Sequence, residues 1–343
     1  MRAIFVKTPG GPEQLELRDT PDPTPSAHEV LIEVRATALN RADLLQRRGL
    51  YPPPPGDSEI LGLECSGVVT LIGRDVSGVR VGDEVMALLG SGGYAERVCV
   101  HERLVLPIPE CLSFETAAAV PEAFLTAHEA LITAAELAPG ERVLIHAAAS
   151  GVGSAAVQIA RELGAQVIAT ARGASKLAAL ARLGVHRAID ASSGSFAEDV
   201  KRVAPEGVDV VLDFVGAPYA EQNQAVLGVG GRWVVVGLLG GTRASVDLGT
   251  LLRKRQTLAG IVMRTRPLPE KAAIVRAFRR DLWPWVADGR IGPIVDSVFP
   301  LAEAARAHER MEANASVGKI VLRVGEPVIR PGRRGGESGQ FRL

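Results

Sequence analysis

The sequence has few cysteines, and their spacing suggests neither a disulfide framework nor a cysteine-rich metal site. Its 343 residues include three cysteines, an odd number, and no two of them form a C-x-x-C pair. A sparse set of this kind is typical of a reducing compartment, so we expect a cytoplasmic protein without disulfides. The six histidines show no metal-ligand spacing either.

Neither sign of charge is in excess, and long apolar runs are missing. The chain has 39 basic and 39 acidic residues, a balance that disfavours nucleic acid or an anionic membrane surface as its main partner. No apolar run reaches membrane-spanning length, and residues 1–7 alternate like a short strand rather than a secretory signal. With 47% hydrophobic residues, the chain is long enough for two globular domains.

The pattern of apolar residues in the sequence changes near residue 114. Before it, short apolar runs at 30–34, 65–72 and 84–89 are separated by glycines, which predicts a compact, largely antiparallel, barrel-like domain. After a helical pattern over 114–137, strand-like and helix-like segments alternate, which predicts a parallel sheet with helices on both faces. These segments are 142–147, 151–163, 166–169, 174–183, 208–212 and 233–236.

The C-terminal part is expected to rejoin the first domain. Residues 271–285 have a helical pattern, and 319–324 form an apolar run that we expect to return as a strand. The segment after Gly325 is rich in arginine and glycine and has little to bury, so we expect a flexible, solvated tail.

The most informative segment is the small-residue loop within 143–160. A buried strand enters it and an apolar-periodic helix leaves it, which is the geometry that places helix N-terminal N–H groups against a pyrophosphate. In a G-x-G-x-x-G pattern, Ala148, Ser150 and Gly153 would take the glycine positions, with Gly151 beside them. The bare pattern is weak, because small residues at such turns also serve packing.

The end of the next strand favours NADPH. An acidic residue would normally bind the adenosine ribose hydroxyls of NAD here, but the position holds Ala171. Arg172 and Lys176 follow, and these cations can pair with a 2′-phosphate. The alternative is that both are ordinary surface charges, although a helix N-terminus disfavours cations.

At this point the chain resembles the zinc-independent quinone oxidoreductases, the zeta-crystallin-like branch of the medium-chain dehydrogenases/reductases. The resemblance is nearest to the tumour-suppressor-inducible quinone reductases and extends over about residues 1–324. It rests on these motifs: KTPGGPE (7–13), ALNRADL (38–44), QRRGLYPPP (46–54), LGLECSG (61–67), GGYAE (92–96), DFVG (213–216), GGRWV (230–234), MEAN (311–314) and GKIV (318–321).

The resemblance implies an α/β fold with a GroES-like, β-rich catalytic domain and a Rossmann domain with a doubly wound parallel sheet. The expected boundaries are 1–122 and 266–325 for the catalytic domain, 123–265 for the NADPH-binding domain and 326–343 for the tail. The active site is expected in the cleft between the domains. A homodimer is also implied, joined through sheet edges near residues 256–262.

Zinc independence follows from the residues at the matching ligand positions. Alcohol dehydrogenases of the superfamily bind a catalytic zinc through cysteine and histidine. Here the corresponding residues are Asn40, Leu63 and Glu122, and Glu64 alone cannot build a tetrahedral site. The structural-zinc lobe is missing too, since Cys99 and Cys111 alone cannot supply it. We expect no metal.

An enzyme without zinc needs an acceptor that delocalises incoming charge itself. The expected reaction is direct hydride transfer from the nicotinamide C4 of NADPH to a quinone. An alkenal, enone or enoyl-thioester reductase is the alternative enzyme. A nucleotide- or RNA-binding, crystallin-like protein is the alternative of another class, disfavoured by the neutral charge. The loops 51–58 and 88–93 are expected to shape the substrate pocket.

The resemblance also assigns roles position by position. Catalysis is assigned to Tyr51, as a donor to the substrate carbonyl, and to Asn40, at the nicotinamide-ribose end of the cofactor. Tyr51 could equally be an aromatic packed on its prolines, and Lys319 is as readily structural as functional. Ala191 stands where many relatives carry a tyrosine against the 2′-phosphate. The remaining cofactor-binding residues are Thr126, Ser150, Gly151, Val152, Gly153, Arg172, Lys176, Gly216, Gly237, Leu238, Met263, Arg264 and Asn314.

Overall fold

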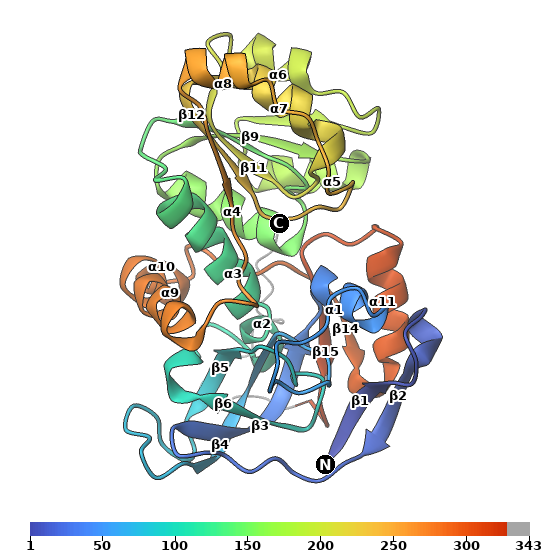
Figure 1. Cartoon of the computed structure of the whole chain (residues 1–343). Helices are drawn as coiled ribbons and strands as arrows, with labels where there is room; N and C mark the ends of the chain where they lie inside the picture. Colours follow the sequence, from blue (N-terminus) through green and yellow to red (C-terminus); the bar gives the residue numbers. More distant parts are fainter. Residues whose placement is uncertain (328–343) are drawn as a thin grey trace. The chain divides into compact units, whose positions relative to one another are not determined.

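The computed structural model describes residues 1–327, and within them the chain divides into two compact units. Unit 1 comprises residues 1–125 and 263–327, and unit 2 comprises residues 126–262. Most of the segment predicted to be a flexible tail, residues 328–343, lies outside the described residues. Figure 1 shows that each unit contains its own sheet.

Unit 1 is built on a seven-stranded sheet in the order β14-β15-β3-β4-β5-β7, with β6 also paired to β3. Only the β14–β15 pair in it is parallel. The strands of this sheet are β3 (Glu29–Ala38), β4 (Glu64–Ile72), β5 (Glu84–Leu88), β6 (Arg97–His101), β7 (Val105–Pro107), β14 (Val295–Pro300) and β15 (Lys319–Arg323). A separate antiparallel pair is formed by β1 (Arg2–Val6) and β2 (Leu15–Asp19). Strand β15 pairs with β3, Val321 opposite Ala38, which confirms the predicted return of the C-terminal strand.

The helices of unit 1 are shorter than the sequence pattern predicted. They are α1 (Arg41–Arg47), α2 (Phe114–Ala117), α9 (Leu268–Asp281), α10 (Trp283–Ala287) and α11 (Ala304–Glu312), with the division into units falling inside α3 (Pro121–His128). The helix predicted over 114–137 is interrupted before Pro121, because proline lacks the N–H that would continue the ladder. The helix predicted over 271–285 is likewise two helices, with Pro284 in the first turn of α10.

Unit 2 is a Rossmann-type layer structure. Its six strands are all parallel and follow the order β10-β9-β8-β11-β12-β13. The strands are β8 (Arg142–Ile145), β9 (Gln166–Ala171), β10 (Arg187–Asp190), β11 (Val208–Asp213), β12 (Leu227–Val235) and β13 (Thr257–Gly260). The helices are α4 (Gly151–Glu162), α5 (Ala174–Arg182), α6 (Ala197–Val203), α7 (Ala220–Val226) and α8 (Leu248–Lys254). Figure 1 shows α6, α7 and α8 on one side of the sheet and α4 on the other.

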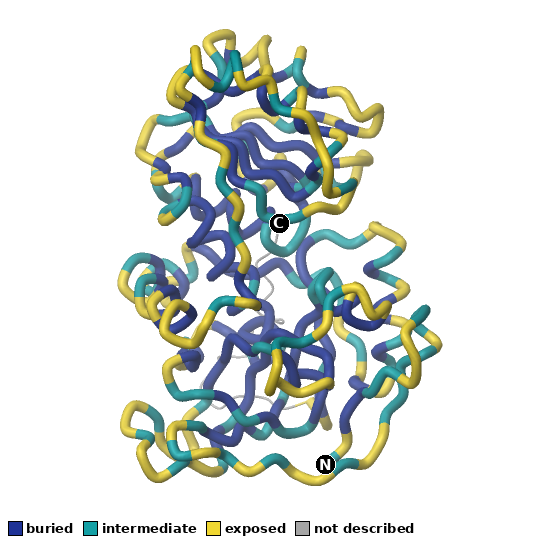
Figure 2. The backbone as a smooth tube through the Cα atoms, viewed as in Figure 1, coloured by how far each residue is buried: buried dark blue, intermediate teal, exposed yellow. Residues whose placement is uncertain are grey.

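The strand order places a topological switch point in unit 2. From β8 the chain runs outward through β9 to β10, then crosses back to β11 beside β8 and continues to β13. Ligands of open α/β sheets bind at the carboxyl ends of the strands at such a point. The central strands β8, β9 and β11 are mostly buried, as Figure 2 shows, whereas the outer strands β10 and β13 keep exposed residues. The central strands therefore supply the scaffold for the loops at their ends.

Candidate cofactor and substrate sites

The loop between β8 and α4 has the geometry that the sequence pattern predicts for a pyrophosphate site. Ser150 is the N-cap of α4, and its Oγ accepts a hydrogen bond from the Gly153 N–H at 3.1 Å. A Cβ on Gly153 would lie 2.5 Å from the Ala147 carbonyl oxygen, so this position requires glycine for the helix to pass the strand end. The first turn of α4 contains no acidic residue, which leaves its positive end open to an anion.

The neighbouring strand brings the predicted 2′-phosphate residues to the same edge of the sheet. Strand β9 pairs with β8 and ends at Ala171, which is buried. Arg172 follows and is exposed, and its guanidinium makes no hydrogen bond or ion pair with residues 1–327. Gly173 has φ +91°, and Lys176 lies in the first turn of α5, partly buried. Ala191, just after β10, is buried and offers no polar group.

Asp213, at the end of β11, fixes the loops that carry the other predicted glycines. Its Oδ1 accepts hydrogen bonds from the N–H groups of Val215 at 2.7 Å and Gly216 at 2.9 Å. Its backbone carbonyl accepts one from the Gly237 N–H at 3.2 Å. Gly216 has φ +81° and pairs with Gly241 across the two loops. The structure therefore brings Gly216 and Gly237 together, and Leu238 beside them is half exposed.

A buried polar network behind these loops was not found by the sequence analysis. His146 Nε2 lies 2.7 Å from Asn223 Oδ1, and its Nδ1 lies 2.8 Å from Thr170 Oγ1. The Asn223 amide donates to Asp213 Oδ2 at 3.0 Å, so its oxygen is the acceptor toward histidine. This requires the proton on Nε2. Burial lowers the pKa of His146 to about 4, so the ring stays neutral and holds Asp213 in place through Asn223.

Thr126, predicted to contact the nicotinamide ribose, carries an unsatisfied hydroxyl. The residue lies on α3 and is buried, and among residues 1–327 its Oγ1 has no hydrogen-bond partner. Buried hydroxyls are nearly always paired in proteins. The Thr126 hydroxyl is therefore available to donate a hydrogen bond to a bound ligand or to accept one from it.

In unit 1, Asn40 belongs to a fully hydrogen-bonded cluster with Glu64 and Lys319. Lys319 Nζ donates to Glu64 Oε1 at 2.6 Å, to Asn40 Oδ1 at 2.6 Å and to the Leu39 carbonyl at 2.7 Å. The Asn40 amide also donates to Glu64 Oε1, at 3.0 Å, and Glu64 Oε2 accepts from the Glu122 N–H at 2.8 Å. The side chains of Glu64 and Lys319 are 0% and 5% exposed. We refer to Asn40, Glu64 and Lys319 as the ammonium cluster.

The ammonium cluster contains two of the positions that were compared with zinc-ligand positions, Asn40 and Glu64. The Glu64 carboxylate already accepts hydrogen bonds from an ammonium, a side-chain amide and a backbone N–H. Within residues 1–327, no three histidine, cysteine, aspartate or glutamate side chains gather as metal ligands would. Metal independence stays a prediction.

Glu122 extends from the first turn of α3 next to the ammonium cluster. Burial, and then the charge of Glu64, raise the pKa of the Glu122 carboxyl to about 8, against the opposing effect of Lys319. Its side chain keeps part of its surface exposed. Glu122 thus holds a proton near neutral pH, a property that no sequence pattern indicated.

Tyr51 is held by Arg264, another residue that the sequence analysis assigned to the site. The Arg264 Cζ lies 5.1 Å from the centre of the Tyr51 ring, and its Nη1 donates to the Tyr51 carbonyl at 3.2 Å. The other guanidinium nitrogens donate to Gly90 O at 2.8 Å and Gln46 Oε1 at 2.6 Å. Burial raises the pKa of Tyr51, so its hydroxyl stays protonated as a donor. Met263, the preceding residue, is buried.

Asn314 is hydrogen-bonded to the chain neighbour of Asn40 and is not part of the ammonium cluster. It is exposed, has φ +53° at the end of α11, and accepts a hydrogen bond from Arg41, the residue after Asn40. Its predicted role in closing the cofactor site remains a prediction.

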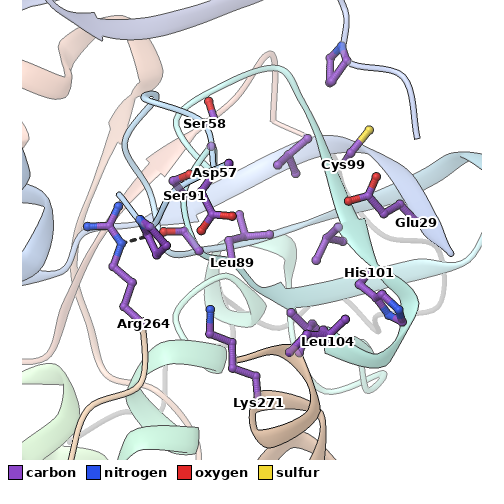
Figure 3. A pocket seen from close by; sticks show the side chains of 18 of the residues that line it. Glu29, Asp57, Ser58, Leu89, Ser91, Cys99, His101, Leu104, Arg264 and Lys271 are labelled. Carbon is purple, nitrogen blue, oxygen red and sulfur yellow. Dashed lines mark hydrogen bonds between the residues drawn. The ribbon is translucent and has the colours of Figure 1, made fainter. Parts of the chain in front are cut away.

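A cavity of about 790 Å³ lies within unit 1, shown in Figure 3. Both loops predicted to shape the substrate pocket contribute to it, through residues 54–58 and 89–92. Other walls come from β6, from residues 264–268 with Lys271, and from the N-terminal part of the chain, including Met1, His28 and Glu29. Since the loops come from different parts of the chain, the fold is what brings them to one cavity. No helix among residues 1–327 is long and apolar enough to cross a bilayer.

Known proteins resemble the chain along nearly its whole length. Residues 26–110 match the alcohol dehydrogenase GroES-like domain family, and residues 151–278 match the zinc-binding dehydrogenase family. The quinone oxidoreductase of Rattus norvegicus is 32% identical, with 94% of this chain and 97% of that protein covered. A phenolphthiocerol/phthiocerol polyketide synthase polypeptide of Mycobacterium tuberculosis is 34% identical over 94% of this chain, but the chain spans only 15% of its length.

Solved structures also resemble the chain over nearly its whole length. A mycobacterial protein complexed with NADPH superposes with a TM-score of 0.84 at 31% identity, covering 94% of this chain and 100% of that one. The CurK enoyl reductase superposes with a TM-score of 0.84 at 33% identity, covering 94% and 99%.

Proposed function

The chain belongs to the quinone oxidoreductase branch of the medium-chain dehydrogenases/reductases, and on that premise we propose that it is a cytoplasmic NADPH:quinone reductase. It is an oxidoreductase of an α/β fold with GroES-like and Rossmann domains. The finer assignment, hydride transfer to a quinone without a metal, is the proposal.

The cofactor is NADPH, and the residues of unit 2 fit it. The α4 N-terminus with Ser150 and Gly153 accommodates the pyrophosphate, and the unpaired hydroxyl of Thr126 suits the ribose. Arg172 and Lys176 pair with the 2′-phosphate, since they follow the strand next to the pyrophosphate loop. When bound, the cofactor supplies the hydride from its nicotinamide ring.

Unit 1 supplies the groups for the acceptor. Tyr51 donates a hydrogen bond to the acceptor carbonyl oxygen, and Arg264 fixes the ring and the loop that carry this donor. The reduced acceptor takes its proton from solvent or from a nearby hydroxyl. These residues position the acceptor and exclude water, and they favour an acceptor that spreads incoming charge over its own conjugated system.

The observation that carries the proposal is the ammonium cluster. Its carboxylate is neutralised by Lys319, and its polar groups satisfy one another, so the donor set is not that of a zinc site. A quinone needs no Lewis acid at this position, whereas a simple alcohol would.

A second candidate is an enone or enoyl-thioester reductase. It is supported by the likeness to the CurK enoyl reductase at 33% identity. A conjugated enone meets the same chemical requirement as a quinone, because the carbonyl delocalises charge from the β-carbon.

We also propose that the protein acts as a homodimer joined through β13. This strand ends the order of the unit 2 sheet, so one of its edges is available for pairing. Leu258 in β13 is 44% exposed. Size-exclusion chromatography with light scattering tests this.

An absorbance assay at 340 nm tests the reaction. The protein is given NADPH or NADH with 1,2-naphthoquinone, 9,10-phenanthrenequinone or a 2-alkenal. Arg172→Ala with Lys176→Ala should abolish turnover with NADPH and retain it with NADH. Lys201→Ala with Arg202→Ala removes two exposed cations elsewhere in unit 2 and should change neither. Turnover of the alkenal alone would favour the second candidate, and no turnover of any acceptor would refute both.

A further inference from the structure

The unit 1 cavity contains a buried lysine that the proposed reaction does not use. Lys271 lies in the first turn of α9, and its side chain lines the cavity although the residue is only 8% exposed. Its ammonium makes no hydrogen bond or ion pair with residues 1–327. Its Nζ, unlike the buried unpaired atoms of the described residues, keeps accessible surface, so a ligand in the cavity can reach the ammonium.

A second unsatisfied group lines the same cavity. Ser91 is 8% exposed, and its Oγ has no hydrogen-bond partner in the described part of the chain. Figure 3 shows Lys271 and Arg264 extending toward the loop that carries Leu89 and Ser91. The fold therefore brings an unpaired cation to the cavity and places an unpaired hydroxyl, whose oxygen is itself buried, in the loop that forms its wall. Ammonium and hydroxyl groups are donors that bind an oxyanion.

The other charged groups around Lys271 leave this part of the cavity positive. The groups that act on its charge are Asp57, Glu122 and Arg264. The three acceptors of the Arg264 guanidinium are a side-chain amide and two backbone carbonyls, so its charge is hydrogen-bonded without being neutralised. Glu122 is protonated near neutrality, since its pKa is raised to about 8.

Asp57 is therefore the carboxylate that opposes two cations here. It is exposed, makes no ion pair with Lys271, and its carboxylate lies against the loop of Gly90 and Ser91. Glu29 and His101 lie at the opposite side of the cavity in Figure 3. Burial, rather than a partner, dominates the environment of Lys271 and lowers its pKa. An anion bound beside it would remove this penalty.

We propose that the cavity binds the carboxylate or phosphate oxygens of a small organic anion through Lys271 Nζ and Ser91 Oγ, and that this anionic group belongs to the acceptor itself. The inference rests on the proposed function in one respect, namely that the cavity holds the acceptor. It names a substrate class: quinones or enones that carry a carboxylate or phosphate group away from the reacting carbon.

Binding of inorganic phosphate tests the site without any turnover. Isothermal titration at constant ionic strength should show saturable binding to the wild-type protein. Lys271→Met should weaken it roughly tenfold or more, the loss expected for one hydrogen bond to a charged group, and Ser91→Ala should weaken it less. Lys201→Met, the same change at an exposed position of unit 2, should leave binding unchanged. Lys271→Met is expected to fold, because it removes a buried charge.

A matched pair of acceptors tests the substrate class. The pair is a naphthoquinone with a carboxyalkyl side chain and its methyl ester, which differ in charge but not in the reacting ring. The acid should have the higher kcat/KM with wild type, and the advantage should disappear in Lys271→Met while the ester is reduced as before.

The outcomes separate the two proposals. Phosphate binding that depends on Lys271, without reduction of either quinone or of a 2-alkenal, would refute the proposed function and leave the anion site standing. Reduction of both quinones at equal rates, with no saturable phosphate binding, would refute the anion site. Phosphate binding without any advantage for the acid would show that the anion is not part of the acceptor and would overturn the substrate class.

Discussion

Removing the Lys319 ammonium should destabilise unit 1 strongly, because Glu64 would then be a buried carboxylate without its cation. Lys319 and Glu64 are 5% and 0% exposed, and their atoms lie 2.6 Å apart. After Lys319→Met, Glu64 retains the Asn40 amide and the Glu122 N–H as donors. Breaking a buried pair on one side costs about 3–5 kcal/mol, so we expect a loss of that size in the free energy of unfolding.

A second substitution shows whether the loss comes from charge. Glu64→Gln keeps the shape of the side chain and removes its charge, so the double variant Lys319→Met/Glu64→Gln should recover about 1–3 kcal/mol relative to the sum of the two single losses. Urea unfolding followed by circular dichroism measures all three variants. Lys201→Met, on an exposed turn of α6, should lose less than about 0.5 kcal/mol. Additive losses in the double variant would refute the reasoning.

Three further changes test other parts of the structure. The Glu122 carboxyl has a folded pKa of about 8, above its unfolded value of about 4.5, so it lowers the free energy of unfolding of the wild-type protein as pH rises between these values. Glu122→Gln removes this loss, so the stability of the variant relative to wild type should be higher at pH 9 than at pH 5. The partial exposure of the side chain limits the gain to about 1–2 kcal/mol. His146 has a folded pKa of about 4, below its unfolded value, so the wild-type protein should lose roughly 3 kcal/mol of stability as pH falls from about 6.5 toward 4, and His146→Gln should not show this loss. Gly153→Ala should lower stability by about 1–3 kcal/mol and weaken NADPH binding, because the new Cβ would lie 2.5 Å from the Ala147 carbonyl oxygen.

Urea titrations across pH measure the first two changes, and fluorescence titration with NADPH measures the third. If Glu122→Gln unfolds with the same pH dependence as wild type, the raised pKa of Glu122 is contradicted. If His146→Gln unfolds with the same pH dependence as wild type, the lowered pKa of His146 is contradicted. Gly260→Ala is the matched control for Gly153→Ala, because a Cβ at Gly260 meets nothing within 4 Å. Equal NADPH affinity in Gly153→Ala and wild type would contradict the close approach at the loop.

Local patterns were sufficient to predict much of the fold. The alternating strands and helices of unit 2 follow from hydrophobic periodicity, and the residues predicted at its strand ends lie at one edge of its sheet. The helix limits were less predictable where proline intervenes, as at Pro121 and Pro284, because apolar periodicity continues across a break in the hydrogen-bond ladder.

The chemistry of the site depends on contacts that no local pattern contains. Lys319 and Glu64 are 255 residues apart, and their pairing exists only because β15 returns beside β3. The raised pKa of Glu122 and the unpaired ammonium of Lys271 likewise arise from burial by distant segments. The resemblance could assign Asn40 and Tyr51, but only the fold reveals which groups are satisfied and which are not.

The most direct test of the proposed reaction uses NADPH labelled with deuterium at one or the other position of the nicotinamide C4. With 1,2-naphthoquinone as acceptor, direct hydride transfer predicts that one labelled cofactor is oxidised more slowly than unlabelled NADPH and that the other is not. Oxidation that is independent of the quinone, or equally fast with both labelled cofactors and unlabelled NADPH when transfer is rate-limiting, would contradict the account.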